Sequence, residues 1–336
     1  MTINAIPGNN DKSARNRRAG SLSLRNRLLI TFILLASLPV LITGIVSGLI
    51  NAQGLRTASI EQLSSVAQLK ANEIAAWVAS LQTNLSLAWQ GKDFVGTING
   101  ILTNTAESGS LKKDVVNKFN NWNQTTGYFD ELFIMNQDGI VILSTTPSQE
   151  GKIFLTQPFF HEGLNGNFVT PPVYDVSLSK YSIFFSQPIT DESGKVLGVI
   201  TGRANLATLD KIMVERAGLG ETGETYLIGA NYSLLSQLRF GDTKIGETYI
   251  RTTGTTNAIE SQTTGSALYN DYRGSAVLGS YLWIPDLEVA LIAEHDQNEA
   301  LQSSNRAFAI TLGLMILTVA IAVGTAFLVT RTIVTP

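Results

Sequence analysis

The stretch LLITFILLASLPVLITGIVSGLINAQGL, residues 28–55, contains no charged residue and decides how this chain is organised. It exceeds the roughly 20 apolar residues that a helix needs to cross the hydrocarbon core of a bilayer. A second uncharged stretch, AFAITLGLMILTVAIAVGTAFLVT, occupies residues 307–330. A charge at the centre of either stretch would cost about 2.5 to 3.5 kcal/mol on insertion. The sequence therefore predicts transmembrane helices at 28–50 and 307–330, with a large segment between them.

Basic residues before the first stretch predict the orientation of the chain. Residues 1–27 carry six Lys and Arg side chains and a single acid, Asp11, and such an excess of positive charge favours the cytoplasm. A cleaved signal peptide fits less well, because its apolar region spans only about 7 to 15 residues and ends at a small-residue site. We therefore expect a two-pass plasma-membrane protein with both termini cytoplasmic and the middle segment extracytoplasmic.

The middle segment is acidic, and the chain lacks cysteine. Residues 51–306 include 26 acids and 17 bases, and there is no Cys at any position. This composition argues against nucleic acid as a partner, because neutralising phosphates needs a clustered basic face. The absence of cysteine excludes disulfide scaffolds, thiolate zinc sites and thiol catalysis. Stability must then come from ordinary apolar cores, and a segment of this length can form one or two of them.

A long helix is predicted after the first span. Residues 57–89 contain neither Pro nor Gly, and apolar residues recur in them at spacings near three and four. These apolar residues are Leu63, Val66, Ile74, Trp77, Leu81 and Leu85. A stripe of this period is typical of an amphipathic helix. It can pack on the chain's own sheet or on a helix of a partner.

Beyond this helix, the pattern of apolar residues predicts two hairpins. Residues 131–136 and 140–144 flank Gln137-Asp138-Gly139, a sequence typical of a tight hairpin turn. Residues 181–189 and 196–204 form the second predicted hairpin. A helix is predicted to follow at residues 206–215.

The same order of elements recurs in weaker form in the second half of the middle segment. The predicted strands are 225–229 with 232–236 and 276–283 with 289–294, and a helix follows at 296–306. Such an internal repeat predicts two similar α+β units, each an antiparallel sheet that carries helices.

The layout resembles the double Cache sensor regions of bacterial transmembrane receptors. The stretches that carry the resemblance are FIMNQDGIVILS (133–144), SQPITDESGKVLGVITGRANL (186–206), GLGETGETYLI (218–228), DYRG (271–274) and AEHDQNEA (293–300). The last six residues, RTIVTP at 331–336, resemble the start of a HAMP signal-relay domain.

This resemblance implies an α+β fold in which two PAS-like antiparallel-sheet modules lie on a long N-terminal helix, flanked by two transmembrane helices. The expected parts are a cytoplasmic basic tail (1–27), a first transmembrane helix (28–50), a long helix (51–90), a membrane-distal module (91–217), a membrane-proximal module (218–306), a second transmembrane helix (307–330) and the start of a relay (331–336).

The resemblance also implies a function, namely ligand sensing outside the membrane and signalling across it. We expect the input region of a sensor histidine kinase, with a chemoreceptor or a nucleotide cyclase as alternative outputs beyond Pro336. The region itself is then not an enzyme. Two other classes stay open, a membrane-anchored extracytoplasmic enzyme and an adhesion or assembly protein.

A G-x-x-x-G motif in the first span points to a helix partner. Gly44 and Gly48 allow two helix backbones to approach closely in a membrane. Because receptors of this kind work as dimers, we expect a homodimer in contact with membrane lipid, and a small molecule as the ligand.

Motifs for catalysis or cofactors are not convincing in this sequence. Gly218, Gly220 and Gly223 spell G-x-G-x-x-G, but they follow a predicted helix and precede a strand, the reverse of a dinucleotide site. The two histidines, His161 and His295, show no metal-ligand spacing. We therefore predict no catalytic residue, no metal ligand and no cofactor.

The ligand pocket expected in the distal module departs from the amino-acid signature of the family. Members that bind amino acids carry Y-x-x-x-x-R-x-W-Y and a later Asp. Here Lys152 replaces the first Tyr, Gln157 replaces the Arg, and Arg203 stands where the Asp would fall. A guanidinium suits a carboxylate or a phosphate, so the sequence predicts a small anionic ligand without a free amine.

The residues expected to contact this ligand come from three stretches of the distal module. They are Arg203, Lys152, Gln157, Phe159, Phe160, Tyr174, Asp175 and Tyr181. One alternative stays open at this point. Arg203 can instead form a structural ion pair with an acid such as Asp175 or Asp210.

Overall fold

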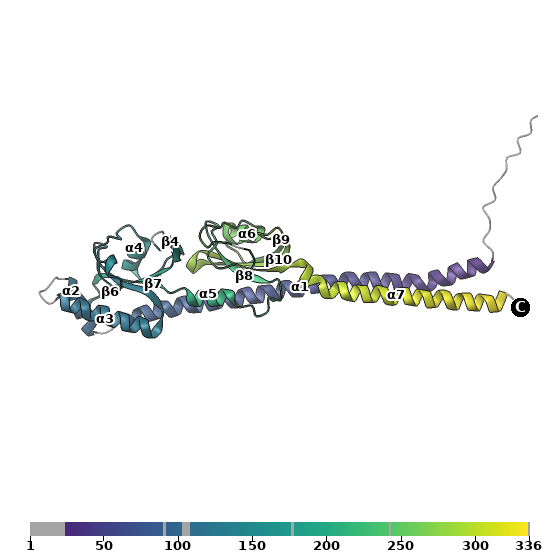
Figure 1. Cartoon of the computed structure of the whole chain (residues 1–336), viewed down its shortest axis with the longest axis horizontal. Coiled ribbons are helices and arrows are strands. Elements are labelled where there is room, and N and C mark those ends of the chain that lie inside the picture. The colour runs from purple at the N-terminus through teal and green to yellow at the C-terminus, as the bar shows by residue number, and fades with distance from the viewer. Residues whose placement is uncertain (1–23, 90–91, 103–107, 176–177, 242, 335–336) are drawn as a thin grey trace, which may run out of the picture. The chain divides into compact units, whose positions relative to one another are not determined.

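A computed structural model describes residues 24–89, 92–102, 108–175, 178–241 and 243–334 (Figure 1). Most of the predicted basic tail, residues 1–23, and the end of the predicted relay, residues 335–336, lie outside these ranges. The helices are α1 (Leu24–Trp89), α2 (Lys92–Leu102), α3 (Ser108–Thr126), α4 (Pro158–Asn165), α5 (Ala207–Val214), α6 (Thr253–Ser261) and α7 (Gln297–Val334). The strands are β1 (Phe129–Asn136), β2 (Val141–Ser144), β3 (Phe168–Val169), β4 (Val173–Asp175), β5 (Lys180–Ser182), β6 (Phe184–Thr190), β7 (Val196–Ala204), β8 (Glu224–Gly229), β9 (Gly265–Asn270), β10 (Ala276–Ile284) and β11 (Val289–Asp296).

The described residues form two compact units. One contains the residues up to Gln53 and those from Ser303 onward, and the other is Gly54–Gln302. The first unit consists of the apolar parts of α1 and α7, which are long and apolar enough to cross a membrane, with mean hydropathies of 2.4 and 2.5. Most of their described large apolar side chains are exposed, as expected for helices that face lipid rather than a protein core. Together with the mixed helices and antiparallel sheets of the second unit, they give the predicted α+β class.

The G-x-x-x-G motif of α1 faces α7 of the same chain within the first unit. A Cβ built on Gly48 would lie 3.1 Å from Cδ2 of Phe308, and one on Gly44 would lie 3.9 Å from Cγ2 of Thr311. The close approach that these glycines permit is therefore used inside one chain. In this structure the motif thus contacts α7 of the same chain, whereas the sequence led us to expect a contact with a second copy.

The distal module is built on a five-stranded antiparallel sheet in the order β2-β1-β7-β6-β3. The first predicted hairpin is present as β1 and β2, and Gly139 in its turn has φ of +70°. A Cβ at Gly139 would lie only 2.8 Å from the backbone nitrogen of Leu155, so glycine is required there. The sheet lies between α4 on one face and α1 with α3 on the other (Figure 1).

The proximal module is built on a four-stranded antiparallel sheet in the order β8-β11-β10-β9. Helix α6 covers one face of this sheet and α1 the other (Figure 1). A capping box between Thr252 and Thr255 begins α6, which satisfies backbone donors at its first turn. The pairing of β10 with β11 agrees with the hairpin predicted at 276–283 and 289–294.

The apolar stripe predicted for the long helix packs on the sheets of its own chain. Leu63, Ile74, Leu81 and Leu85 are at most 1% exposed and belong to one core with residues of both sheets. Polar contacts also fix α1, because Nε2 of Gln187 donates to the carbonyl of Gln82 at 2.7 Å. Of the two packing partners left open by the sequence, the structure shows the chain's own sheets.

Three details of the predicted elements are wrong. The stretch 181–189 is two strands, β5 and β6, interrupted at Ile183. Residues 232–236 form isolated bridges rather than a strand, because the chain there turns away in a loop. Helices α2 and α3 and the edge strand β9 were not anticipated. Strand β9 has a weak apolar signal, because most of its residues are half-buried or exposed in alternation.

Candidate functional site

The distal module contains a cavity of about 230 Å³ on the face of the sheet that carries α4. Strand β1 provides Glu131 and Phe133, β7 provides Arg203, and β6 provides Phe184. Helix α4 and the segments around it provide the rest. The complete lining is Glu131, Phe133, Gln149, Lys152, Phe154, Gln157, Phe159, Val173, Asp175, Phe184 and Arg203.

Strand register brings the charged groups of this cavity together. Arg203 on β7 stands directly opposite Glu131 on β1 and directly opposite Phe184 on β6. Residues opposite each other in an antiparallel pair share a face and lie in contact. Nη2 of Arg203 accordingly donates to Oε2 of Glu131 in an ion pair, and the Arg203 guanidinium carbon lies 5.8 Å from the centre of the Phe184 ring.

The Glu131–Arg203 pair is almost completely removed from solvent. The side chains are 2% and 8% exposed, respectively. Oγ of Ser144 donates to the other carboxylate oxygen of Glu131 at 2.9 Å, and Oδ2 of Asp175 lies 4.0 Å from Nη1 of Arg203. Nε of Arg203 is buried and has no hydrogen-bond acceptor among the described residues. The guanidinium is thus neutralised by Glu131, and one of its buried donors lacks an acceptor in the described part of the chain.

Aromatic rings form the apolar wall of the cavity. Phe159 lies with its ring centre 4.8 Å from Phe184, 5.4 Å from Phe154 and 6.0 Å from Phe133. Pro158 at the first position of α4 and extended Gln157 before it place Phe159 at the start of the helix. A ligand in this cavity would therefore contact rings on one side and charged groups on the other.

The charges that line the cavity balance. Arg203 and Lys152 supply two positive groups, and Glu131 and Asp175 supply two negative ones. Within the described ranges, Lys152 takes part in no ion pair, and its side chain is exposed. Lys152 is therefore the cation of the cavity that is available to a ligand's negative group.

Five of the eight residues predicted for the site line this cavity. They are Arg203, Lys152, Gln157, Phe159 and Asp175. Phe160 does not, because consecutive residues of a helix point about 100° apart, and its 1%-exposed side chain packs in the core between α4 and the sheet. Asp210, named as an alternative partner of Arg203, is not that partner, since Glu131 holds this place.

Tyr174 and Tyr181 also lie outside the cavity. Side chains alternate along a strand, so the neighbours Val173 and Asp175 reach the cavity while Tyr174 points to the opposite side of β4. Tyr174 and Tyr181 stand opposite each other across the β4–β5 pair, with ring centres 5.4 Å apart. Both rings contact the position of Gly246.

The sequence-based prediction missed the residues that β1, β4, β6 and the segment after β2 bring to the cavity. These are Glu131, Phe133, Gln149, Phe154, Val173 and Phe184. The period-two alternation of β1 places Glu131 and Phe133 on one face, but only the register between β1 and β7 shows that this face meets Arg203. That register joins residues about 70 positions apart, which no local pattern specifies.

We assign no metal to the described residues. The acids that lie together, Glu224, Asp271 and Glu294, already accept hydrogen bonds from tyrosine hydroxyls and from Arg273. Their oxygens are thus engaged by protein donors rather than arranged around an open position.

Comparison with known proteins identifies the family. Residues 51–304 match the Cache domain. The chain belongs to the double Cache family. No curated protein matches it. Cache domains are ligand-binding sensor modules rather than catalytic ones, so the matched region is a sensor region and not an enzyme.

Solved Cache structures show the same fold at low sequence identity. The ligand-binding domain of the Campylobacter jejuni chemoreceptor Tlp3, in complex with 4-methylisoleucine, is 14% identical and has a TM-score of 0.54, with 73% of this chain and 94% of that chain covered. The sensor domain of the V. cholerae histidine kinase DctB is 11% identical and has a TM-score of 0.51, with 71% and 98% covered. One neighbour is thus a chemoreceptor and the other a histidine kinase. At these identities the Cache fold is shared, and neither ligand nor output follows from it.

Proposed function

We propose that this chain is the sensory input region of a two-pass membrane receptor, and that its ligand is a small organic acid bound in the distal cavity. The observation that carries the proposal is the cavity itself, which joins an aromatic wall to an available cation, Lys152, and to the side chain of Arg203. A mostly apolar cavity with a few convergent polar groups is the usual form of a small-molecule site.

The contacts around Arg203 support a revised role for the predicted anion-binding group. Because Glu131 neutralises the guanidinium, Arg203 acts as a hydrogen-bond donor to a ligand oxygen, and Lys152 supplies the net positive charge. The apolar part of the acid packs on Phe159 and Phe184. The balance of charges in the cavity disfavours multiply charged anions, since only one cation lacks an ion-pair partner there.

Calorimetric titration of the chain in lipid nanodiscs with small organic acids and amino acids tests this proposal. We expect binding of a monocarboxylic acid with an apolar or aromatic part. Lys152→Ala should weaken it by about tenfold, the equivalent of about 1.4 kcal/mol. Lys195→Ala is the matched control, because Lys195 is an exposed lysine of the same module in the β6–β7 turn, and it should leave affinity unchanged.

Two outcomes would contradict the proposed ligand class. One is binding of amines without a carboxylate, which would make Asp175 the important charge. The other is equal affinity in the Lys152→Ala variant and the wild type.

As the output of the receptor we propose a histidine kinase, with signalling through α7 and the relay-like residues 331–336. The family match and the apolar helices at both ends support a membrane receptor. Autophosphorylation of the intact receptor with ATP, altered by the organic acid, would support a kinase, whereas adaptational methylation would indicate a chemoreceptor.

A further inference from the structure

Three carboxylates lie buried together in the proximal module, far in sequence from the distal cavity. Glu224 begins β8, Asp271 follows β9 and Glu294 lies near the end of β11. Their exposures are 3%, 6% and 0%, respectively. One oxygen of each lies within 4.8 Å of the others. The distal cavity includes none of these three acids.

Glu294 is held by neutral groups only. The hydroxyls of Tyr226 and Tyr269 donate to its two oxygens at 3.2 and 2.9 Å, respectively. Within the described chain, no Lys, Arg or His forms an ion pair with it. Glu224 is bound by the hydroxyl of Tyr272 at 2.8 Å.

The other charged groups around Glu294 are few. Arg273 on the β9–β10 turn is engaged by Asp271, with Nε 2.6 Å from Oδ2. On α6, which packs over the same face, the ionisable side chain is Glu260, and it is exposed and paired with Arg251 at 3.0 Å. Strand β10 contributes Tyr281, whose hydroxyl accepts a hydrogen bond from Asn257.

Buried carboxylates this close together cannot all be ionised, because each negative charge disfavours the next and burial disfavours them all. Burial raises the pKa of Glu294 to about 8, and the Glu224 and Asp271 carboxylates act in the same direction against the hydrogen bonds from the tyrosines. Burial also raises the pKa of Glu224. The group therefore holds a proton on Glu294 at neutral pH.

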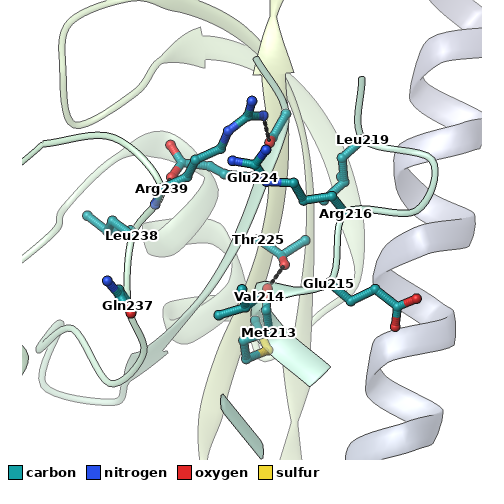
Figure 2. Close-up of a pocket in the computed structure, with 11 residues that line it drawn as sticks. Met213, Val214, Glu215, Arg216, Leu219, Glu224, Thr225, Gln237, Leu238 and Arg239 are labelled. Carbon is teal, nitrogen blue, oxygen red and sulfur yellow. Dashed lines mark hydrogen bonds between the residues drawn. The ribbon is translucent and has the colours of Figure 1, made fainter. Parts of the chain in front are cut away.

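A cavity of about 200 Å³ between α5, β8 and residues 237–239 borders this group at Glu224. Figure 2 shows Glu224 at its wall beside Arg239, with Met213 and Leu219 among the apolar residues that line it. The backbone nitrogen of Arg239 donates to Glu224 at 3.1 Å. Glu224 thus connects the cavity to the buried oxygens around Glu294.

The acid group is also joined to the start of the last helix. Arg273 bridges Asp271 and Asp296, since its Nη2 lies 2.8 Å from Oδ1 of Asp296. Asp296 is the last residue of β11, and α7 begins at Gln297. Its backbone nitrogen donates to Oγ1 of Thr222 at 3.1 Å. Arg273 therefore contacts the residue that immediately precedes α7.

We propose that the proximal module is a second sensor, which detects the pH on its side of the membrane through protonation of Glu294 and transmits the change to α7 through Arg273 and Asp296. Loss of the proton leaves a negative charge beside Glu224 and Asp271. This charge competes with Asp296 for Arg273, and the Arg273–Asp296 contact weakens. The proposal does not depend on the ligand of the distal cavity, so either can fail alone.

The test uses the whole chain in lipid nanodiscs between about pH 5 and about pH 10. This range includes both the protonated and the ionised form of Glu294. Infrared spectroscopy follows the carbonyl band of a protonated carboxylic acid. A spin label on Gln302→Cys, an exposed position of α7 in a chain without other cysteines, reports the mobility of that helix. We expect both signals to titrate together near pH 8, and Glu294→Gln to abolish both changes.

Glu260→Gln is the matched control, because it removes an exposed carboxylate from the same module and should leave both titrations in place. Tyr269→Phe is a second variant. It removes a hydrogen bond that favours the ionised form of Glu294, so both midpoints should move to higher pH. The proposal is overturned if no band disappears in Glu294→Gln, if Tyr269→Phe leaves the midpoints in place, or if the band titrates while the label does not respond.

Stability provides an independent check with a defined sign. A carboxyl group whose folded pKa lies above its ordinary value of 4.5 contributes stability that is complete below that value and is lost as pH rises toward 8. The melting temperature of the wild type should therefore fall by about 5 °C between about pH 6 and about pH 9. This slope should be much smaller in Glu294→Gln, and an equal slope would contradict a titrating Glu294.

Discussion

Glu131 and Arg203 form a deeply buried ion pair whose two members depend on each other. Their attraction in the protein interior offsets the desolvation of both charges, and Ser144 satisfies a further oxygen of Glu131. Removing one partner leaves the other as an uncompensated buried charge. The pair therefore fixes the pairing of β1 with β7 at one end of the cavity.

Arg203→Met should lower the free energy of unfolding by about 3 to 5 kcal/mol, because it leaves Glu131 buried without a cation. The double variant Glu131→Gln/Arg203→Met removes both charges and should recover at least half of that loss. Urea unfolding followed by tryptophan fluorescence measures both values. If the double variant is no more stable than Arg203→Met, the pair is not coupled as described.

Lys70, in the middle of α1, binds the C-terminal end of α5 through hydrogen bonds. Lys70 is 4% exposed, and its ammonium group donates to the carbonyls of Ile212 and Glu215 at the end of α5. Burial lowers the pKa of Lys70, while the nearby acids Glu215 and Glu73 act against this. One side chain thus satisfies carbonyls that the helix end leaves without a partner.

Lys70→Ala should lower the free energy of unfolding by about 1 to 3 kcal/mol, since it leaves buried carbonyls without a donor. Lys113→Ala, at an exposed position of α3, is the control and should change stability little. Urea unfolding of the two variants in parallel provides the comparison. Similar midpoints for both would mean that water replaces the lysine without loss.

Elements with a strong local pattern could be predicted from the sequence, and elements defined by distant partners could not. The long helix and the β1–β2 hairpin have an unbroken apolar period and a glycine turn at Gly139. Strand β9 pairs only with β10 at a sheet edge, so its burial pattern is weak. The site follows the same division: Arg203 was identified from its own stretch, whereas Glu131 and Phe184 required the register of three strands.

At the scale of the whole molecule, the apolar helices raise the question of what occupies the Gly44–Gly48 face. Within one chain, Phe308, Thr311 and Met315 of α7 contact it. A dimer through the same face would have to displace them. The motif was interpreted from sequence as a contact between copies, and the helix pair of a single chain is the competing interpretation.

The double variant Gly44→Cys/Thr311→Cys should form a disulfide within one chain under mild oxidation, because a Cβ at Gly44 lies 3.9 Å from Cγ2 of Thr311, an atom that a cysteine sulfur at position 311 can replace. The absence of natural cysteines makes the products unambiguous. Non-reducing electrophoresis separates an internal disulfide from a covalent dimer. Efficient dimer formation by Gly44→Cys alone would instead place this face between two copies.

The contact between Oγ of Ser64 and Oγ of Ser280, 3.2 Å apart across 216 residues of sequence, has a consequence for synthesis. At translation rates of about 5 to 20 residues per second, the ribosome needs roughly 10 to 40 s to make the chain between them. During that interval the finished apolar stripe of α1 has no sheet from the proximal module to cover it. The helix that packs on both sheets in the mature protein thus exposes part of its apolar stripe while the protein is being made.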